Sequence, residues 1–463
     1  MALVESFSGI RGIYGKDLTE STAVRYAWAY NSFLKKKTGK GNPTLVIGTD
    51  TRLSGSKLSD SVIGVLDCNF IDVGIAPTPA IEFSVRYFNA DGGIIITASH
   101  NEPYWNGFKF LGSNGAVINE KEMSQVINNS KTLKDFHKIQ DRKILEKNNE
   151  ALKKYTEFAL RIVGAKNIEK ITASKQKIVL DPNGGAGIIV KKILEQIGIN
   201  VVGVNMGYGE FNRTVEPTED SLIYLKNIID GNNADFAAGF DCDADRIGIL
   251  MANAKFLSGN QILALVVQEA LSNPDTSKKK IVVVNDATSN VVRDVAASLG
   301  ARIKEVEVGE TNVVEEMLRL NAIAGGEGSS GGAIIPPSMC RDGILTLLII
   351  LSKIANSGKK LDELVKYLPE YYTLRNKIEF DAKKHDKIKK NIKQHYSRQG
   401  FEIRETGGIK GGLKIITGRN SFVWFRASKT EGSIFRIMSD SDKKEEAEKL
   451  MHDATNIFNK ANE

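Results

Sequence analysis

One pattern occurs three times along the chain, and it limits the possible folds more than any other feature of the sequence. In each repeat, an apolar run rich in β-branched residues is followed by a short polar loop and then by a stretch of helical character. Two further apolar runs complete the repeat, which predicts strands that alternate with helices. The runs cover residues 44–47, 70–73 and 93–96 in the first repeat, residues 177–180, 200–204 and 235–239 in the second, and residues 281–284, 302–308 and 321–324 in the third.

This alternation indicates parallel βαβ units, in which helices cover both faces of a sheet. The third run of each repeat leads into an unusual loop, at residues 97–103, 241–246 and 325–332. Ligands of such sheets collect beyond the carboxyl ends of the strands, so we expect these loops to carry the function. Generic α/β alternation is the alternative, but the matched position of the three loops favours true repetition.

The length of the chain agrees with several domains. Its 463 residues are about three times the ~150 residues of a typical domain. We expect an α/β protein in which three topologically repeated α/β domains with mixed sheets cover residues 1–150, 151–253 and 254–367. A smaller C-terminal α+β domain is expected over residues 368–463, and its lysine-rich segment at residues 383–393 is typical of a solvent-facing helix.

Charge and composition exclude several classes of function. Lys and Arg total 63 against 56 Asp and Glu, and the net charge of +7 suits small anionic ligands without indicating nucleic acid. The longest apolar stretch, residues 343–351, is far shorter than the ~20 residues that span a bilayer. Neither a secretory signal nor a disulfide framework is indicated. We therefore expect a cytoplasmic protein with no membrane or nucleic-acid partner.

The first loop places a hydroxyl group at the end of a predicted strand. Ser99 and His100 lie in residues 97–103, and Lys109 follows shortly after. Neighbouring residues on an extended chain point in opposite directions, so a Ser–His pair is weak evidence of catalysis. Taken alone, the segment is more typical of a turn or helix cap.

The second loop carries three alternating carboxylates, Asp241, Asp243 and Asp245. Alternation places them on one side of an extended segment, where they repel one another unless a cation lies among them. Oxygen ligands of this kind suit a hard cation. An EF-hand is excluded, because Arg246 stands where that loop needs glycine and Ala252 where it needs glutamate. A solvated acidic loop is the alternative, although Arg246 favours an anion bridged to a metal.

Two further loops could bind a substrate. Residues 325–332 contain G-x-G-x-x-G, but Pro336 and Pro337 follow too soon for the helix of a dinucleotide site. A loop that presents Glu327 and hydroxyl groups to a polyol is favoured over a plain glycine-rich connection. Residues 426–432, with Arg436 nearby, combine side chains typical of a phosphate site, although basic surface loops are common. The sequence has no Walker motif, which excludes P-loop nucleotide chemistry.

Together, these loops resemble those of the α-D-phosphohexomutases, the family of phosphoglucomutase, phosphomannomutase and phosphoglucosamine mutase. The resemblance covers nearly the whole chain in the family's order. Each motif is modest alone, but the ordered series is highly specific. It consists of SGIRG (8–12), GTDTRLSG (48–55), PTP (77–79), TASHN (97–101), NGFK (106–109) and EPT (216–218), together with the aspartate, sugar and phosphate loops.

The resemblance implies a fold, a reaction and a set of site residues. The fold would be four domains around a central active-site cleft. The reaction would exchange hexose 1-phosphate and hexose 6-phosphate through a phosphoserine and a hexose 1,6-bisphosphate, which also acts as activator. Ser99 would carry the phosphoryl group and complete a Mg²⁺ site made by Asp241, Asp243 and Asp245. Other implied residues are Arg11 and Arg246 facing the phosphoryl group, His100 and Lys109 for proton transfer, Glu327 and Ser329 for the sugar, and Arg426, Ser428, Lys429, Thr430 and Arg436 for the second phosphate.

The chain departs from the family pattern at several positions. Cys242 and Ala244 replace glycines of the aspartate loop, and Glu102 separates the TASHN segment from its proline. The sugar loop ends in Gly332 instead of histidine, and a second family histidine is missing near residues 309–311. The residues for phosphoryl transfer are complete. The departures leave the sugar open among glucose, mannose and glucosamine phosphates, and the oligomeric state is not indicated.

Two other functions remain open at this point. Asp241 and Asp243 after an apolar run also resemble the nucleophile motif of haloacid-dehalogenase-type phosphatases, although that motif usually has Thr or Val where Asp245 stands. A regulator that binds sugar phosphates without turnover is the other alternative. The presence of Ser99 and Lys109 beside the three aspartates argues against it.

Overall fold

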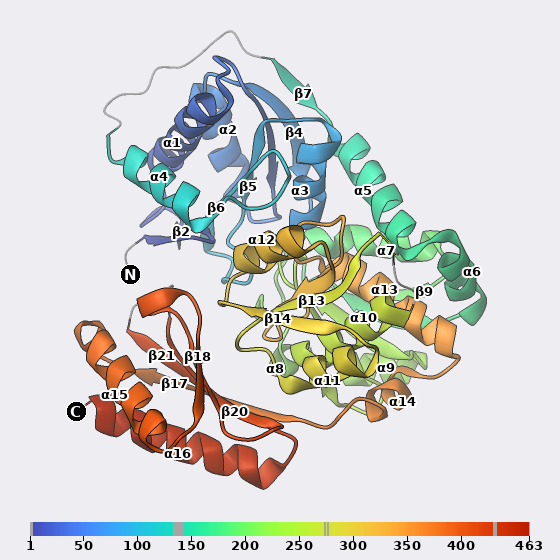
Figure 1. Ribbon diagram of the computed structural model, residues 1–463. Coiled ribbons are helices and arrows are strands. Elements are labelled where there is room, and N and C mark those ends of the chain that lie inside the picture. Colours follow the sequence, from blue (N-terminus) through green and yellow to red (C-terminus); the bar gives the residue numbers. More distant parts are fainter. Residues whose placement is uncertain (1–2, 133–142, 273–274, 276, 429–432, 463) are drawn as a thin grey trace. The chain divides into compact units, whose positions relative to one another are not determined.

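The computed structural model describes residues 3–132, 143–272, 275, 277–428 and 433–462. The chain forms two compact units, whose elements are labelled in Figure 1. The first unit comprises Met1–Leu257 and Ser330–Leu364, and the second comprises Ser258–Ser329 and Val365–Glu463. The domain boundaries expected after residues 150, 253 and 367 stay predictions.

The first unit contains the first two sheets. Their strands are β1 (Val4–Ser6), β2 (Gly9–Ile13), β3 (Thr44–Thr49), β4 (Asn69–Ile75), β5 (Gly92–Ile96), β6 (Trp105–Leu111) and β7 (Ile144–Glu146), followed by β8 (Lys177–Asp181), β9 (Asn200–Gly203), β10 (Phe236–Phe240), β11 (Ile247–Met251) and β12 (Phe256–Leu257). The helices of this unit are α1 (Glu20–Thr38), α2 (Gly55–Val65), α3 (Thr78–Tyr87), α4 (Glu120–Ser130), α5 (Asn148–Val163), α6 (Ala165–Ser174), α7 (Ile189–Gln196), α8 (Glu219–Leu222), α9 (Leu225–Asn232) and α13 (Gly343–Ser357). The short strand β16 (Ala333–Ile334) also belongs to it.

The second unit contains the third α/β sheet and the C-terminal sheet. Its strands are β13 (Lys279–Asn285), β14 (Arg302–Val306), β15 (Ala322–Gly326), β17 (Tyr372–Glu379), β18 (Glu402–Glu405), β19 (Leu413–Ile416), β20 (Ser421–Ala427) and β21 (Ile434–Ser441). Its helices are α10 (Gly259–Ser272), α11 (Asn290–Ser298), α12 (Glu310–Leu320), α15 (His385–Arg398) and α16 (Lys444–Asn462), and the short α14 (Leu361–Lys366) spans the boundary between the units.

The centres of the three α/β sheets share one strand order. In the first sheet, β3 lies between its parallel neighbours β5 and β4. In the second, β8 lies between β10 and β9, and in the third, β13 lies between β15 and β14, again all parallel. Each apolar run found in the sequence overlaps one of these nine strands. The predicted threefold repetition is therefore confirmed.

Antiparallel strands extend the first two sheets. β6 pairs with β5 and β2, and β2 pairs with β1. In the second sheet, β11 pairs with β10 and β12. The predicted fold class, three α/β domains with a smaller C-terminal domain, is confirmed. The central cleft concerns the placement of the two units and stays a prediction.

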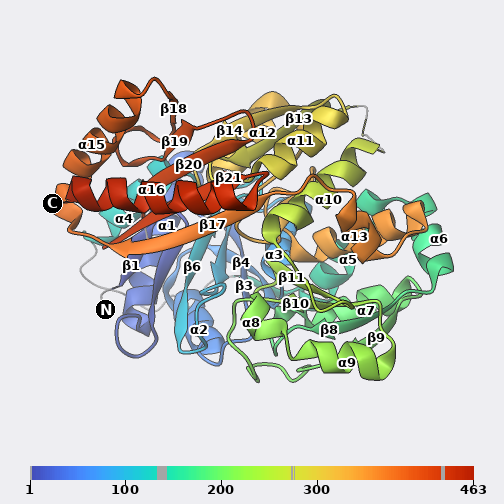
Figure 2. The same cartoon turned by 90° about the horizontal axis from the view of Figure 1, so that it is seen from below.

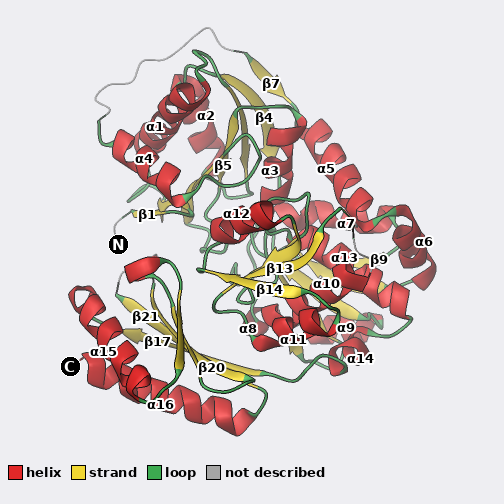
Figure 3. Ribbon diagram, viewed as in Figure 1, coloured by secondary structure: helices red, strands yellow, loops and turns green. Residues whose placement is uncertain are grey.

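Helices cover both faces of the first sheet (Figure 3). Leu45 and Ile47 of β3 pack with residues of α1, α2 and α4, among them Tyr30 and Val126. α3 covers the opposite face, where Ile81 lies against Gly48 of β3. The near-continuous apolar sequence of β3 follows from this arrangement, because a parallel strand of this kind is buried on both sides.

The C-terminal sheet is antiparallel, with the strand order β17–β21–β20–β19–β18. Figure 2 shows α16 lying across this sheet. Ile388 and Ile392 of α15 and Phe458 of α16 fill the core between helices and sheet. The lysine-rich segment forms α15, as expected, but Lys389 is buried. Its Nζ donates a hydrogen bond to the carbonyl oxygen of Gly408 at 2.8 Å.

The longest apolar stretch of the sequence forms α13, which is buried along most of its length. Among the described residues, no helix has both the length and the apolar character needed to cross a bilayer. Asp342 is the N-cap residue of α13, and its Oδ1 accepts a hydrogen bond from the Leu345 N–H at 2.8 Å. The Tyr155 hydroxyl of α5 donates to the same oxygen, also at 2.8 Å. Asp342 is fully buried, and this burial raises its pKa to about 6.

We predict that Asp342→Asn changes the pH dependence of stability. Asparagine keeps the helix cap and can still accept the Tyr155 hydrogen bond, but it cannot ionise. The folded wild type binds a proton at Asp342 more tightly than the unfolded chain does. Protonation of Asp342 therefore stabilises the folded state at low pH, and this stabilisation is lost as the pH rises through about 6. Between about pH 4 and pH 8, the unfolding free energy of wild type should fall by about 3 kcal/mol relative to that of the variant.

Denaturant unfolding at several pH values tests this prediction. Asp60→Asn is the matched control, because Asp60 is exposed on α2, and its pH profile should parallel that of wild type. If Asp342→Asn and wild type lose stability in parallel across this pH range, the buried carboxyl does not titrate as expected.

Candidate active site

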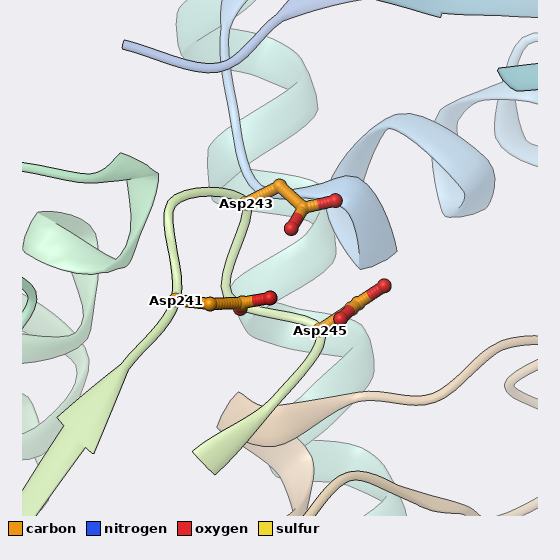
Figure 4. A group of neighbouring side chains, drawn as sticks. All are labelled: Asp241, Asp243 and Asp245. Carbon is orange, nitrogen blue, oxygen red and sulfur yellow. The ribbon is translucent and has the colours of Figure 1, made fainter. Parts of the chain in front are cut away.

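The three alternating aspartates lie in the loop between β10 and β11, and their carboxylates gather on one side of it (Figure 4). All three are at most 1% exposed. One carboxylate oxygen of each lies within 4.8 Å of the others. Ala244, which stands where the family usually has glycine, adopts the left-handed region with φ of 54°. This turn allows the carboxylates to converge.

The electrostatics of the loop favour a bound cation. Burial, and then the charges of Asp243 and Asp245, raise the pKa of Asp241 well above its usual range. Burial alone would also raise the pKa of Asp245, but Lys109, Arg341 and Arg246 together hold it below its usual range. Asp243 Oδ1 and Asp245 Oδ1 are buried and accept no hydrogen bond from the described residues. Crowded, unsatisfied carboxylate oxygens are a suitable donor set for Mg²⁺.

Ser99 follows β5 and lies against the aspartate loop. Its hydroxyl donates a hydrogen bond to Asp241 Oδ2 at 3.2 Å, although the two residues are 142 positions apart. Ser99 has a φ of 51°, in the left-handed region that few residues other than glycine adopt. The serine and the aspartates singled out in the sequence are therefore brought together.

Lys109 of β6 joins the same cluster. Its Nζ donates to Asp243 Oδ2 at 2.8 Å and to Asp245 Oδ2 at 3.0 Å. The Thr78 hydroxyl, at the start of α3, donates to Asp243 Oδ2 at 2.6 Å. Buried carboxylates need such partners, because an unpaired buried charge is strongly unfavourable.

Two arginines and a histidine surround the Ser99 loop. Arg11 of β2 donates to the side-chain oxygen of Asn101 at 3.0 Å, and the Arg246 guanidinium pairs with Glu216 at 2.5 Å. Desolvation, and then the charge of Arg246, lower the pKa of Arg11 to about 10. Arg246, burial and Arg11 lower the pKa of His100 well below 6.5. This crowding of positive charge is typical of a site for a phosphate.

The sequence reasoning missed Arg341. Its guanidinium donates to the Ser330 hydroxyl at 3.2 Å and to Asp245 Oδ2 at 3.3 Å. The only sequence signal was its position just before the cap of α13, and nothing in that position indicates a contact with the aspartate loop. Arg341 therefore adds a positive charge to the cluster that the motifs did not identify.

Close packing explains why the sugar loop ends in glycine. A Cβ atom on Gly332, where the family usually has histidine, would lie 2.1 Å from the Asp245 carbonyl oxygen. A Cβ atom on Gly331 would lie 1.8 Å from the Ile247 carbonyl oxygen. The segment runs so close to the aspartate loop that no side chain fits at either position.

The second unit contains the predicted sugar residues. Glu327 is buried after β15, and its Oε1 accepts hydrogen bonds from Asn285 Nδ2 at 2.8 Å and from the Gly309 N–H at 2.9 Å. A family histidine is missing near residues 309–311, and in this chain a backbone amide of that segment contacts the glutamate. Ser329 is exposed.

The predicted phosphate residues also belong to the second unit. Arg426 of β20 and Arg436 of β21 are cross-strand neighbours. The Arg426 guanidinium donates to Glu307 Oε1 at 3.1 Å, and both residues are buried. Ser428 follows β20, and its N–H donates to the Ile434 carbonyl oxygen at 2.8 Å. The last two predicted residues, Lys429 and Thr430, lie outside the described residues.

Comparison with known proteins identifies the family. Models of the α/β/α domains I, II and III of phosphoglucomutase/phosphomannomutase match residues 5–136, 153–254 and 258–372, respectively. A phosphoglucomutase/phosphomannomutase of Thermococcus kodakarensis is 36% identical over 453 residues, which cover 96% of this chain and 95% of that protein.

The chain belongs to the phosphoglucomutase/phosphomannomutase family of intramolecular phosphotransferases. This confirms the α-D-phosphohexomutase resemblance and the enzyme class expected from the sequence. A phosphoglucosamine mutase of Methanococcus maripaludis is also similar, with 30% identity over 96% of each chain.

Solved structures of the family share the fold. A phosphoglucomutase/phosphomannomutase family protein from Burkholderia thailandensis matches with a TM-score of 0.81 at 19% identity, over 99% of this chain and 97% of its own. An N-acetylphosphoglucosamine mutase of Aspergillus fumigatus, solved with GlcNAc-6P and magnesium, matches with a TM-score of 0.62 at 14% identity, over 100% of this chain and 96% of its own. The acidic triad of this phosphohexomutase is consistent with a magnesium site.

Proposed function

We propose that this phosphohexomutase moves a phosphoryl group between O1 and O6 of glucose and mannose phosphates, with Ser99 as the carrier. The observation that supports this role is the contact of the Ser99 hydroxyl with Asp241, in a cluster that also contains Lys109. The hexose 1,6-bisphosphate would be the intermediate, and it would also phosphorylate resting enzyme. The cytoplasmic location expected from the sequence stays a prediction.

Asp241, Asp243 and Asp245 would hold Mg²⁺, together with the phosphate on Ser99. Their buried, crowded oxygens suit a hard cation. When bound, Mg²⁺ offsets charge on the phosphoryl oxygens during transfer. Arg11 and Arg246 would contact the same oxygens from the protein side, where fixed positive charge stabilises the transition state.

Each transfer breaks one O–P bond and forms another. In the first half, the bond between Ser99 Oγ and phosphorus breaks and a sugar hydroxyl oxygen binds the phosphorus. The hydroxyl proton leaves to a base, and Ser99 Oγ takes up a proton and ends as a hydroxyl group. Arg246 and burial lower the pKa of His100, which keeps its imidazole in the neutral form that a base requires and makes it a weaker base than a free imidazole. Lys109, which contacts the aspartate loop, would assist this proton transfer. The second half reverses these steps with the other phosphate of the bisphosphate.

The sugar must bind in two opposed orientations for both halves to occur. Its 3- and 4-hydroxyls exchange places between these orientations, and they are equatorial in glucose and in mannose. Glu327 and Ser329 would bind them, since a carboxylate can accept hydrogen bonds from two neighbouring hydroxyls. Asn285 and Gly309 hold Glu327 Oε1 in place. Arg426, Ser428, Lys429, Thr430 and Arg436 would bind the phosphate that is not transferred.

Phosphoglucosamine mutase activity is the second candidate. It is favoured by the similarity to the enzyme of Methanococcus maripaludis. Glucosamine differs from glucose at carbon 2, which the proposed contacts of Glu327 do not read. Glucosamine 1-phosphate therefore belongs in the substrate panel.

We predict that Ser99→Ala lowers mutase turnover by several orders of magnitude, because the phosphoryl group then has no carrier. The assay follows glucose 6-phosphate formed from glucose 1-phosphate with glucose 1,6-bisphosphate present, and free phosphate is measured in parallel. Circular dichroism should show that the variant is folded. Near-normal turnover would contradict the assignment of Ser99 as the phosphoryl carrier, and stoichiometric release of phosphate would indicate a phosphatase.

We predict that Asp243→Asn weakens Mg²⁺ binding and turnover together. Asparagine keeps the shape of the side chain but removes a charged oxygen ligand, so the Mg²⁺ concentration for half-maximal activity should rise at least about tenfold. Asp235→Asn is a control, since Asp235 is exposed, directly precedes β10 and lies outside the cluster. Full activity of the wild type in excess chelator would contradict a metal requirement.

We predict that the enzyme accepts both glucose 1-phosphate and mannose 1-phosphate as substrates. The two sugars differ only at carbon 2, and strong rejection requires a buried polar group that the wrong substrate leaves unpaired. The glycine at position 332 removes one side chain that could have served for discrimination. A preference beyond roughly a thousandfold, about 4 kcal/mol, would show that carbon 2 is read.

A further inference from the structure

The loop at residues 48–55 is a family motif to which the proposed chemistry assigns no role. Its Asp50 and Arg52 form an ion pair, and neither side chain has any exposed surface. The Arg52 N–H also donates to Asp50 Oδ1 at 2.9 Å. A buried ion pair is poor evidence for stabilisation as such, because desolvation offsets its attraction. The burial of an ion pair at this place in the fold therefore requires another explanation.

Arg52 contacts the backbone of the Ser99 loop directly. Its Nη2 donates to the Ser99 carbonyl oxygen at 2.9 Å, and also to the carbonyl oxygen of Asn101. The guanidinium contacts Asp50 through Nη1 and the two carbonyl groups through Nη2, because its donors are spread over a rigid planar fork. Lysine carries its three donors on one nitrogen and cannot reproduce the separation of these contacts over two nitrogens.

Asp50 reaches the other side of Ser99 through Thr97. The Thr97 hydroxyl donates to Asp50 Oδ2 at 2.6 Å, and the Ser99 N–H donates to the Thr97 hydroxyl oxygen at 2.8 Å. The N–H and the carbonyl group of Ser99 are thus both tied to the same buried ion pair. The Asp50 N–H in turn donates to the Ile96 carbonyl oxygen at 3.1 Å, which fixes this loop to the end of β5.

These contacts hold Ser99 in a conformation that it would otherwise avoid. Its φ of 51° is in the left-handed region, which is unfavourable for a residue with a Cβ atom. Such residues persist only where their surroundings determine the backbone, and they concentrate at functional sites. Here the conformation coincides with a hydroxyl directed at Asp241.

We propose that Asp50, Arg52 and Thr97, the Ser99 clamp, are positioning residues that keep the Ser99 hydroxyl in the geometry required for phosphoryl transfer. The proposal rests on the proposed role of Ser99 as carrier. All three clamp residues are buried, none of them is among the residues proposed to bind sugar or phosphate, and the clamp acts through the backbone of Ser99. Its loss should therefore lower kcat and leave substrate binding nearly unchanged, since a small misplacement of a reacting group can cost about a hundredfold in rate.

Thr97→Val tests the clamp with a nearly isosteric change that removes the bridging hydroxyl. We expect kcat to fall about a hundredfold, with KM for glucose 1-phosphate within about threefold of wild type. Phosphorylation of Ser99 by glucose 1,6-bisphosphate, followed by mass spectrometry, should slow to a similar extent. Thr97→Ser keeps the hydroxyl and should restore kcat to within about threefold of wild type.

Two further variants complete the design. Thr49→Val is the matched control, because Thr49 is buried next to the clamp and its hydroxyl has no hydrogen bond among the described residues; its kcat should match wild type. Arg52→Lys keeps the charge but not the fork, and kcat should fall at least about tenfold. This variant also tests the clamp if Thr97→Val does not fold.

The outcomes separate this proposal from the role of Ser99. If Ser99→Ala is inactive while Thr97→Val and Arg52→Lys keep kcat within about threefold of wild type, the clamp is overturned and the carrier assignment stands. A rise in KM at unchanged kcat would also overturn it, because the clamp would then act on binding. If Ser99→Ala keeps its activity, both proposals fail together.

Discussion

The burial of three carboxylates in one short loop is the constraint on which the first unit depends. Asp241, Asp243 and Asp245 are at most 1% exposed, and their repulsion in poorly hydrated surroundings requires nearby positive charge. Lys109 and Arg341 supply it through direct contacts with Asp243 and Asp245. β6 and the segment before α13 therefore each contribute one positively charged side chain to the loop. The same positive charge favours a phosphate beside a metal.

The strand order of the first sheet explains how its polar loops meet. Because β3 and β5 are parallel neighbours, their carboxyl ends lie at the same edge and the loops that follow them are adjacent. Arg52 follows β3 and Ser99 follows β5, so their contact across 47 positions is a consequence of the pairing. Ser99 lies in the connection from β5 to the antiparallel β6, and the supporting loop comes from the parallel neighbour on the other side of β5. The repeated α/β topology therefore gives the Ser99 loop its support.

Sequence patterns predicted the strands and the aspartate loop because both depend on local spacing. Apolar runs mark strands, and alternation marks carboxylates on one side of the chain. Arg341 could not be found in this way, and the motif at residues 48–55 contained Arg52 but did not indicate its contact with the Ser99 loop. Among 63 Lys and Arg residues, no local feature marks the ones that become buried, and Arg341 meets Asp245 across 96 positions. The sequence likewise showed that Gly332 stands where the family usually has histidine. The reason for the glycine is the close approach of the Asp245 carbonyl group, which only the packing of the folded chain shows.

Two residues with left-handed backbones lie in this cluster, Ser99 with φ of 51° and Ala244 with φ of 54°. Each conformation costs roughly 1–2 kcal/mol in a residue with a Cβ atom, and glycine would avoid that cost. Glycine would also give the loop more freedom to leave the conformation. Alanine in the aspartate loop is held instead by its surroundings: its N–H donates to the Asp241 carbonyl oxygen at 3.2 Å, and its Cβ lies close to Gly187. Both loops thus owe their shape to tertiary contacts, and such loops can hold a nucleophile and metal ligands in place before a substrate binds.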